Sequence, residues 1–441
     1  MSLHPVLQEK LNAALMPLAP VRMTPRDVCL PDVAGKVFAV IGMRRAGKTT
    51  FLQQLLAQQR QQLEPQRALY LSFDDDRLAG LGAEQLALLL EEFYRRYPEL
   101  RGRETVHWFL DEIQLIPGWE RFVRRVMDSE KVQVVVSGSS ARMLSREVHT
   151  SLRGRGMEVI IRPFSFREFL RHRGEEPQSE PARWASSTRS KIEMRFGQYL
   201  REGGFPEVQG LSPTLRIDLL QGYVDTVLFR DVVERYGVSQ VAALRWLIRQ
   251  CLRNPASALS VHRLHLDLKA QGLGIAKDAV HALFGYLQDA FLINAVPLAT
   301  ESERQRNTNP RKVYPVDTGL IAAFDASGRA NVGHALESVV HDELARRKLN
   351  IGYGRTTGGF EVDFVARSAD AATQLIQVCA DISEPAVLAR ELRALDDAAL
   401  ACPDAIRRLL LLEPLQQMLP QATGVQIQPV YEWLLTPGTR P

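Results

Sequence analysis

Apolar and polar positions in the first third of the chain follow two alternating patterns. Apolar runs of strand length occupy residues 37–41, 68–73, 106–110 and 132–136. Between them, apolar residues at helical spacing mark a helix over residues 50–57 and another around residues 86–93. The alternation of short buried strands with amphipathic helices predicts an α/β domain.

The middle of the chain has mainly helical patterns. A polar segment at residues 174–187, rich in Glu, Pro and Ser, predicts an exposed linker, and residues 188–236 have helical spacing with a GGFP break inside it. Further on, Ser260 can cap a helix, QGLG makes a turn, and residues 275–287 predict a second helix. This pair of helices within residues 238–300 suggests a winged helix.

The last hundred residues change to a mixed pattern. They predict a helix at 336–347, strands at 351–354, 361–365 and 375–379, a helix at 388–400 and a strand at 406–412. The expected organisation is an N-terminal segment (1–35), an α/β core (36–173), a linker with a helical lid (174–236), a winged helix (237–330) and a C-terminal α/β domain (331–441).

Composition excludes several classes of protein. With 441 residues, 45% apolar and 24% charged, the chain is neither a small disulfide scaffold, a fibre nor a disordered protein. It has no apolar run of about 18 residues, no signal-peptide pattern and no CxxC pair, so we expect a cytoplasmic protein with no membrane partner. Net charge is +4 and most basic residues are Arg, which points only weakly to nucleic acid because GC-rich coding also raises Arg content.

The strongest motif is GMRRAGKT at residues 42–49, which matches GxxxxGK[ST] between a strand and a helix. Backbone N–H groups of such a loop can hold phosphates, Lys48 can reach the β and γ oxygens, and the Thr49 hydroxyl can bind Mg²⁺. The expected cofactors are therefore ATP and Mg²⁺. The candidate cofactor-binding residues are Gly42, Arg45, Ala46, Gly47, Lys48, Thr49 and Thr50.

Candidate catalytic residues follow the next apolar runs. Asp111 and Glu112 end the run at 106–110, where Asp111 would hold Mg²⁺ and Glu112 would polarise the attacking water. Ser137 or Ser139, after the run at 132–136, would sense the γ-phosphate or simply form a turn. Three aspartates at 74–76 favour a polar loop over a metal site. The extra strand at 68–73, between the two motif-bearing strands in the chain, is the order of P-loop ATPases with a catalytic Glu.

Together these motifs resemble a known family, the prokaryotic AAA-type ATPases whose C-terminal half is a domain of unknown function with a PD-(D/E)XK nuclease-like core. The resemblance covers most of the chain and rests on GMRRAGKTT, FLDEIQ, VVVSGSSARML, LRGRGMEVIIRPFSFREFL, GGFPEV, FRDVVERYG, KVYPVDTGL and EVDFVAR. It implies an ASCE-type AAA core with a helical lid, a winged helix and a nuclease-like α/β domain.

The resemblance also implies a ring or dimer in which an Arg of a neighbouring subunit completes the catalytic site. Arg155, in the LRGR segment with Arg153, is the candidate for that role, and an ordinary surface Arg is the alternative. In the lid, Arg230 would contact nucleotide or, more simply, pair with Asp231 or a neighbouring Glu.

In the nuclease-like domain, the resemblance implies a vestigial site. Glu337 and Asp363 are plausible metal ligands, and Gln377 stands at the third strand, where the family has (D/E/Q)xK. That segment is Gln377-Val378-Cys379, and no Lys follows Lys348. A nuclease of this type needs a Lys beside its carboxylates, so we expect an inactive core that still binds DNA or organises an oligomer.

Basic residues of the winged-helix segment are the candidates for DNA contact. Lys277 and His281 lie on the exposed face of the predicted second helix, although winged helices often serve only as protein contacts. The polar stretch 301–312 would form a basic wing on phosphates or a solvated loop, and its candidates are Arg304, Arg306, Arg311 and Lys312.

The sequence thus predicts an ATP-hydrolysing, oligomeric protein that remodels DNA. Branched DNA such as a Holliday junction is the suggested substrate, by analogy of fold. Two alternatives remain open. One is a nucleotide-dependent switch or signalling scaffold with a protein partner, and the other is an active Mg²⁺-dependent nuclease.

Overall fold

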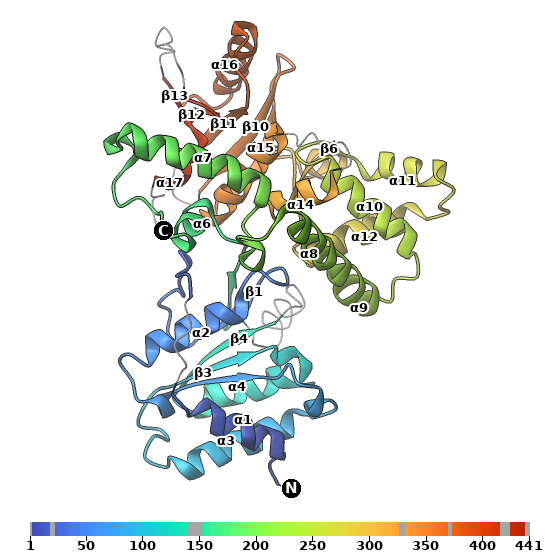
Figure 1. The fold of residues 1–441 in the computed structure, drawn as a ribbon. Coiled ribbons are helices and arrows are strands. Elements are labelled where there is room, and N and C mark those ends of the chain that lie inside the picture. Colours follow the sequence, from blue (N-terminus) through green and yellow to red (C-terminus); the bar gives the residue numbers. More distant parts are fainter. Residues whose placement is uncertain are drawn as a thin grey trace. The chain divides into compact units, whose positions relative to one another are not determined.

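The structure is a computed structural model that describes residues 2–17, 23–138, 152, 154–325, 332–368, 373–414 and 424–436. The chain divides into two compact units, Met1–Arg162 and Pro163–Pro441, which are described separately (Figure 1). Within the described ranges, none of the helices combines the length and apolar character that crossing a bilayer requires.

The first unit contains a five-stranded sheet in the order β2-β3-β4-β1-β5, and all neighbouring strands are parallel. Its elements are α1 (Pro5–Ala14), β1 (Val37–Ile41), α2 (Lys48–Gln59), η1 (Pro65–Arg67), β2 (Ala68–Ser72), η2 (Asp76–Leu78), α3 (Ala83–Arg96), β3 (Val106–Asp111), η3 (Ile113–Leu115), α4 (Trp119–Ser129), β4 (Val132–Ser137) and β5 (Gly156–Ile160).

Both faces of this sheet are covered, as expected for near-continuous apolar strands. Helix α2 packs on one face, where Phe51, Leu52 and Leu56 join Phe38 and Phe109 in one buried cluster. On β3, the alternate residue Trp108 meets Phe93 of α3 edge to face, with ring centroids 5.7 Å apart. The sheet is therefore a rigid layer from which loops project at the strand ends.

The strand order refines one expectation. The strand between the two motif-bearing strands β1 and β3 is β4, whereas β2, which lies between them in the chain, is at the edge of the sheet. Because all these strands are parallel, the residues that follow β1, β3 and β4 meet at one edge. This topology brings the phosphate-loop motif together with Asp111 and Ser137.

The second unit begins with a helical region and a small sheet. Its elements are α6 (Phe166–His172), η4 (Pro181–Arg183), α7 (Ser186–Glu202), η5 (Pro206–Val208), α8 (Pro213–Thr226), the π-helical η6 (Val227–Val233), α9 (Glu234–Tyr236), α10 (Val241–Arg253), β6 (Ala258–Leu259), α11 (Val261–Ala270), α12 (Lys277–Asp289), β7 (Ile293–Val296), α13 (Glu303–Thr308), β8 (Arg311–Pro315) and α14 (Thr318–Phe324).

Helix α6 packs on α7 of this second unit. Its Phe166 and Phe169 are buried against aromatic residues of α7: Phe166 lies 5.2 Å from Phe196 and Phe169 lies 5.2 Å from Tyr199, measured between ring centroids. Burial of these large rings accounts for the position of the boundary at Arg162.

Helices α10, α11 and α12 adjoin the three-stranded antiparallel sheet β6-β8-β7. Ser260 caps α11 by accepting the backbone N–H of Arg263, as its position in the sequence predicts. Leu264 and Leu268 are buried on α11, and Leu283 and Leu287 are buried on α12. The helical spacing of these residues therefore marked the core face correctly.

The C-terminal part is a five-stranded mixed sheet in the order β13-β12-β11-β10-β9, antiparallel from β9 to β11 and parallel from β11 to β13. Its elements are α15 (Val332–Arg346), β9 (Asn350–Arg355), β10 (Glu361–Arg367), β11 (Gln374–Cys379), α16 (Pro385–Ala399), β12 (Ile406–Leu411), β13 (Val425–Pro429) and α17 (Val430–Leu435). The predicted order of elements is correct up to β12, and β13 and α17 were not anticipated.

Helices cover both faces of this sheet too, with α16 on one side (Figure 1). Phe364 and Ala366 of β10 face the cluster that contains α15 and α17, and Val365 faces the cluster that contains α16. Val362 also belongs to the α16 side, because the pairing of β10 with β9 shifts by one residue between Val362 and Val365. This β-bulge lies at Asp363 and Phe364.

Candidate nucleotide site and a buried ionic cluster

The loop between β1 and α2 has a backbone that suits phosphate binding. Gly42 has φ 144°, and a Cβ there would lie 2.1 Å from the carbonyl oxygen of Ile161, so only glycine fits. Gly47, with φ 99°, starts α2, and Arg45 takes φ 66°, which is uncommon for a residue with a side chain. The turn thus delivers backbone N–H groups and the N-terminus of α2 to one place.

Lys48 is folded back over this loop. Its side chain is 6% exposed, and Nζ donates hydrogen bonds to the carbonyl oxygens of Gly42 (3.0 Å) and Met43 (3.1 Å). The loop is also braced by Arg26, whose guanidinium donates to the carbonyl oxygens of Ala46 (3.1 Å) and Arg162. The sequence identified Lys48 from its motif but gave no sign of Arg26.

Asp111 is the centre of the hydroxyl contacts at the strand ends. It is 3% exposed, and its Oδ2 accepts hydrogen bonds from the hydroxyls of Thr49 (2.9 Å) and Tyr70 (2.7 Å). The hydroxyl of Ser137 donates to Oδ1. Burial and the negative charge of Asp111 raise the pKa of Tyr70, so this residue stays a neutral donor.

Tyr70 is a site residue that the sequence did not reveal. It lies on β2, inside an apolar run, and only the pairing of β2 with β3 brings its hydroxyl to Asp111. The fact that a polar-tipped ring interrupts a buried strand is the one signal that could have drawn attention to it. Ser137 holds Asp111 in this structure, and Ser139 lies outside the described residues.

Glu112 comes directly after β3 in a left-handed conformation, with φ 55°. Its backbone N–H donates to the hydroxyl of Ser137 (3.4 Å), and its carboxylate accepts a hydrogen bond from the side chain of Gln114. A positive φ is unusual for a residue with a side chain because it strains the backbone, and such strain is common at functional sites. Gln114 is a second contact that the sequence analysis missed.

The remaining nucleotide-site candidates are placed as follows. Arg45, Thr49 and Thr50 are exposed, whereas Ala46 is fully buried. Arg155 pairs with Asp128 at the surface of the first unit, where its side chain is 44% exposed. Arg153 lies outside the described residues.

These residues fit a Mg²⁺–nucleotide complex. The Thr49 hydroxyl and the Asp111 carboxylate, the oxygen ligands that Mg²⁺ prefers, lie within 2.9 Å of each other. Lys48, Gly47 and the first turn of α2 supply the positive end of the site beside them. Asp75, in the triple-Asp loop, instead pairs with Lys10 and Arg77, so that loop is an ion-paired turn.

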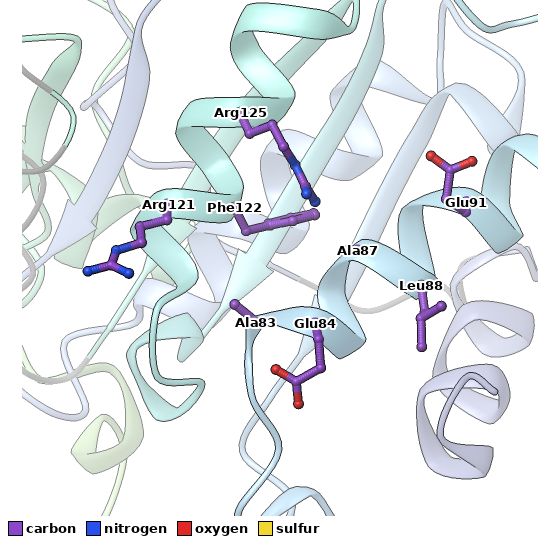
Figure 2. A pocket seen from close by; sticks show the side chains of 8 residues that line it. All are labelled: Ala83, Glu84, Ala87, Leu88, Glu91, Arg121, Phe122 and Arg125. Atoms are coloured by element: carbon purple, nitrogen blue, oxygen red, sulfur yellow. The ribbon is translucent and has the colours of Figure 1, made fainter. Parts of the chain in front are cut away.

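A hollow elsewhere in the first unit is lined by none of the nucleotide-site residues described above. It lies between α3 and α4 (Figure 2), and apolar and charged side chains line it together. Arg125 lies over the ring of Phe122, 5.8 Å from the centroid. The lining residues are Ala83, Glu84, Ala87, Leu88, Glu91, Arg121, Phe122 and Arg125.

In the second unit, the structure corrects the expectation for Lys312. This residue is 3% exposed and cannot serve as a basic wing on phosphates. Its Nζ lies 3.0 Å from Oε1 of Glu337, 2.9 Å from Oδ1 of Asp363 and 2.8 Å from Oε1 of Glu361. The side chain points inward because Lys312 belongs to β8, where strand pairing and not loop solvation sets its direction.

Glu337 and Asp363 therefore do come together, as the sequence predicted, but around an ammonium group. Burial and the charge of Asp363 raise the pKa of Glu337 to about 7, while Lys312 opposes this shift. Burial also raises the pKa of Asp363. Asp363 accepts the backbone N–H of Val378 (3.0 Å) on its other oxygen.

Gln377 faces the same region, and both ends of its amide are used for hydrogen bonding. Its Oε1 accepts the backbone N–H of Asp363 (2.9 Å), and its Nε2 donates to the carbonyl oxygen of Glu361 (3.3 Å) and to the Glu391 carboxylate. Arg390 pairs with that carboxylate at 2.7 Å. A cavity opens beside these side chains, lined by Glu337, Gly359, Phe360, Glu361, Asp363, Gln377, Val378, Arg390, Glu391 and Ala394.

The other candidates for DNA contact are more accessible than Lys312. Lys277 and His281 on α12 are exposed, and so is Arg304 on α13. Arg306 and Arg311 are half-buried, and Arg306 pairs with Glu303.

In the segment predicted as a lid, Asp231 pairs with Arg235 at 3.5 Å. The predicted partner Arg230 is exposed. A neighbouring arginine on the next turn of the same helical segment thus takes the place that the sequence gave to Arg230.

Two family models match the chain. Residues 34–170 match an AAA domain, and residues 193–330 match a domain of unknown function (DUF8612). Together with the strand order and the loop geometry, the first match defines residues 34–170 as an AAA-type P-loop domain, as the sequence motifs predicted.

Two relatives that match more of the chain are uncharacterized proteins. One from Methanocaldococcus jannaschii is 29% identical over 364 residues, which cover 81% of this chain and 78% of that protein. One from Haemophilus influenzae is 27% identical over 399 residues, which cover 90% of this chain and 93% of that protein. The similarity thus extends well beyond the AAA domain.

Similar solved structures include a Walker-type ATPase and an ORC1 protein. A Walker-type ATPase of Pyrococcus abyssi has 14% identity and a TM-score of 0.39, with 73% of this chain and 95% of that chain covered. The ORC1 protein of Aeropyrum pernix, in complex with DNA, has 16% identity and a TM-score of 0.28, with 71% of this chain and 88% of that chain covered. These TM-scores describe a distant likeness.

Proposed function

We propose that this chain is an AAA-type ATPase that hydrolyses ATP with Mg²⁺ as cofactor. The observation that carries the proposal is the meeting of the phosphate loop, Thr49 and Asp111 at one sheet edge, with Glu112 directly after Asp111. Mg²⁺, when bound with nucleotide, neutralises developing charge on the phosphates. Thr49 and Asp111 are the residues that would hold it.

The roles of the other side chains follow from their placement. Lys48 and the N-terminus of α2 bind and orient the phosphates. When nucleotide binds, Lys48 gives up its hydrogen bonds to the loop carbonyl oxygens and donates to phosphate oxygens instead. Glu112 accepts a proton from the attacking water, and Gln114 holds its carboxylate until then. Tyr70 and Ser137 fix the orientation of Asp111.

The proposal includes self-association into a ring or dimer. Arg155 lies at the surface of the first unit, where it pairs with Asp128 and both side chains are about half exposed. A surface arginine that exchanges this partner for the phosphates bound by a neighbouring subunit would stabilise transition-state charge there.

DNA is the partner we propose for the second unit. The order α10, β6, α11, α12, β7, β8 with a three-stranded antiparallel sheet supports the proposal of a winged helix. Its recognition helix would be α12, on which Lys277 and His281 are exposed. The order α15, β9, β10, β11, α16, β12 resembles a nuclease-like core. By analogy of fold, this combination of domains makes branched DNA, including Holliday junctions, the substrate we propose.

The test is the ATPase rate of the full chain alone, with linear duplex, with single strands and with a four-way junction, at one fixed salt concentration. Stimulation greatest with the junction is the expected result. A rate that is measurable but equal in all four samples would contradict the DNA role and leave the ATPase standing. Loss of stimulation in Lys277→Ala, with an unchanged basal rate, would locate the contact on α12.

A further inference from the structure

Three acidic side chains of the second unit converge on one point, and that point is occupied by the ammonium group of Lys312. Glu337 comes from α15, Glu361 and Asp363 come from β10, and Lys312 comes from β8. We propose that Lys312 is a resident cation that takes the place of a divalent metal ion in this centre. The wild-type centre therefore binds no divalent ion, and removal of the ammonium group creates a site for one.

The geometry leaves no room for both cations at this point. An ammonium group has three N–H donors, and each carboxylate lies 2.8 to 3.0 Å from Nζ. Divalent ions bind carboxylate oxygens at about 2.0 to 2.6 Å, so an ion bound by the same oxygens would overlap Nζ. Within the part of the chain that the structure describes, no group of three His, Cys, Asp or Glu side chains is arranged to hold a metal ion.

Two of the three carboxylates are also held by contacts other than Lys312. Oε1 of Glu337 also accepts the hydroxyl of Tyr314 (2.6 Å), and Oδ2 of Asp363 accepts the backbone N–H of Val378 (3.0 Å). These contacts would remain if the ammonium group were removed. With Glu361, these two acids would then bring three carboxylates and a net negative charge to one point, which attracts a divalent cation.

Electrostatics keep Lys312 charged where it lies. Burial by itself would lower the pKa of Lys312, but Asp363, Glu337 and Glu361 together raise it above its ordinary value. A buried ammonium group is stable only when it is paired, and the same holds for the buried carboxylates around it. Loss of the Lys312 charge would leave Glu337 and Asp363 without a counter-ion, and loss of those two acids would leave the buried ammonium group unpaired.

The origin of Lys312 explains why the sequence did not reveal it. The nuclease-like pattern expects its lysine two residues after Gln377, where Cys379 stands, and Cys379 contacts the carbonyl oxygen of Asp381 instead. Lys312 enters from 51 residues before Asp363, on the strand that belongs to the three-stranded sheet. The positive charge of the centre thus comes from a different element of the fold.

The test measures Mn²⁺ bound to the full chain by electron paramagnetic resonance, without nucleotide, in wild type, Lys312→Ala and the double variant Lys312→Ala, Glu337→Gln. Binding at the first unit is common to all three and cancels in the comparison. We expect Lys312→Ala to bind one more Mn²⁺ ion than wild type and the double variant to lose it. Lys312→Arg, which keeps a cation, is the matched control and should gain none.

Two results would overturn the proposal. One is Mn²⁺ bound by wild type and lost in Glu337→Gln, since this would make the centre a metal site with Lys312 as an auxiliary group. The other is a folded Lys312→Ala that gains no ion. If Lys312→Ala does not fold at neutral pH, Lys312→Gln is measured in its place, and its melting temperature should rise with Mn²⁺ while that of wild type does not.

Discussion

The two centres of this molecule bury acidic side chains in opposite ways. Asp111, in the first unit, is surrounded by the hydroxyls of Thr49, Tyr70 and Ser137, which orient its charge without cancelling it. Asp363, in the second unit, meets the ammonium group of Lys312. Neutral donors leave the negative charge of a carboxylate available to a metal ion, whereas a buried cation neutralises that charge. The kind of neighbour therefore decides whether a cluster of acids can bind a metal ion.

The largest effect on the first centre is expected from Glu112→Gln. The amide cannot accept the proton of the attacking water, so turnover should fall by about 10² to 10⁴-fold while ATP binding stays close to wild type. Single-turnover hydrolysis and nucleotide binding are measured on the same preparation. Hydrolysis at the wild-type rate would mean that Glu112 is not the base.

Lys48→Ala should act on binding itself. Loss of a charge-assisted hydrogen bond to phosphate costs about 1.5 to 3 kcal/mol, which corresponds to roughly 10- to 100-fold weaker nucleotide binding. Titration with a fluorescent ATP analogue measures this change, and Lys36→Ala, at the surface of the same unit, is the control. Undiminished affinity would contradict the assignment of the phosphate loop.

The second unit should lose stability as the pH rises. Burial raises the pKa of Asp317 to about 7, and burial with the charge of Asp363 raises that of Glu337 to about 7. Because both are higher than in the unfolded chain, their contribution is full below the unfolded values near 4 and is lost as the pH passes 7. Urea unfolding between pH 5 and 8 should show a decrease on the order of 2 kcal/mol per group.

Asp317→Asn and Glu337→Gln should each remove part of that pH dependence. If the free energy of unfolding depended on pH in both variants as it does in wild type, these carboxyls would not titrate between pH 5 and 8. Glu64→Gln, an exposed change in the first unit, serves as the control.

The smallest effect is expected from Tyr70→Phe. Removal of the hydroxyl leaves Asp111 with Thr49 and Ser137 as donors, so turnover at saturating Mg²⁺ should fall only a few-fold. Nucleotide binding measured in EDTA should not change, because Tyr70 contacts Asp111 and not the loop. A shift of binding in EDTA would indicate a general loss of structure instead of a positioning role.

In the first centre, the sequence predicted those parts that are contiguous in the chain. The phosphate loop and the Asp111–Glu112 pair are short motifs next to strong strand patterns, so local rules were sufficient to find them. The order of helices and strands in the tail up to β12 followed from periodicity in the same way. The position of β4 between β1 and β3 did not follow from periodicity, because long-range pairing sets the order of strands in a sheet.

Contacts between distant side chains were missed for the same reason. Tyr70 and Arg26 act on a loop or a carboxylate far from them in sequence. Lys312 was assigned to the surface because the residues before it are polar. Tyr314, two residues later on the same strand, carried the contrary signal of a buried apolar segment. Burial of a charged residue depends on counter-charges that only the folded chain brings together.

The irregular strand β10 has one more consequence. Val362 and Val365 pack on one face and Phe364 and Ala366 on the other, which is the alternation that an ordinary strand would give if Asp363 were absent. For the layers of the sheet, Asp363 is a surplus position, so a polar side chain there does not interrupt the hydrophobic alternation around it. The bulge thus lets one strand carry both an unbroken apolar pattern and a carboxylate of the ionic centre.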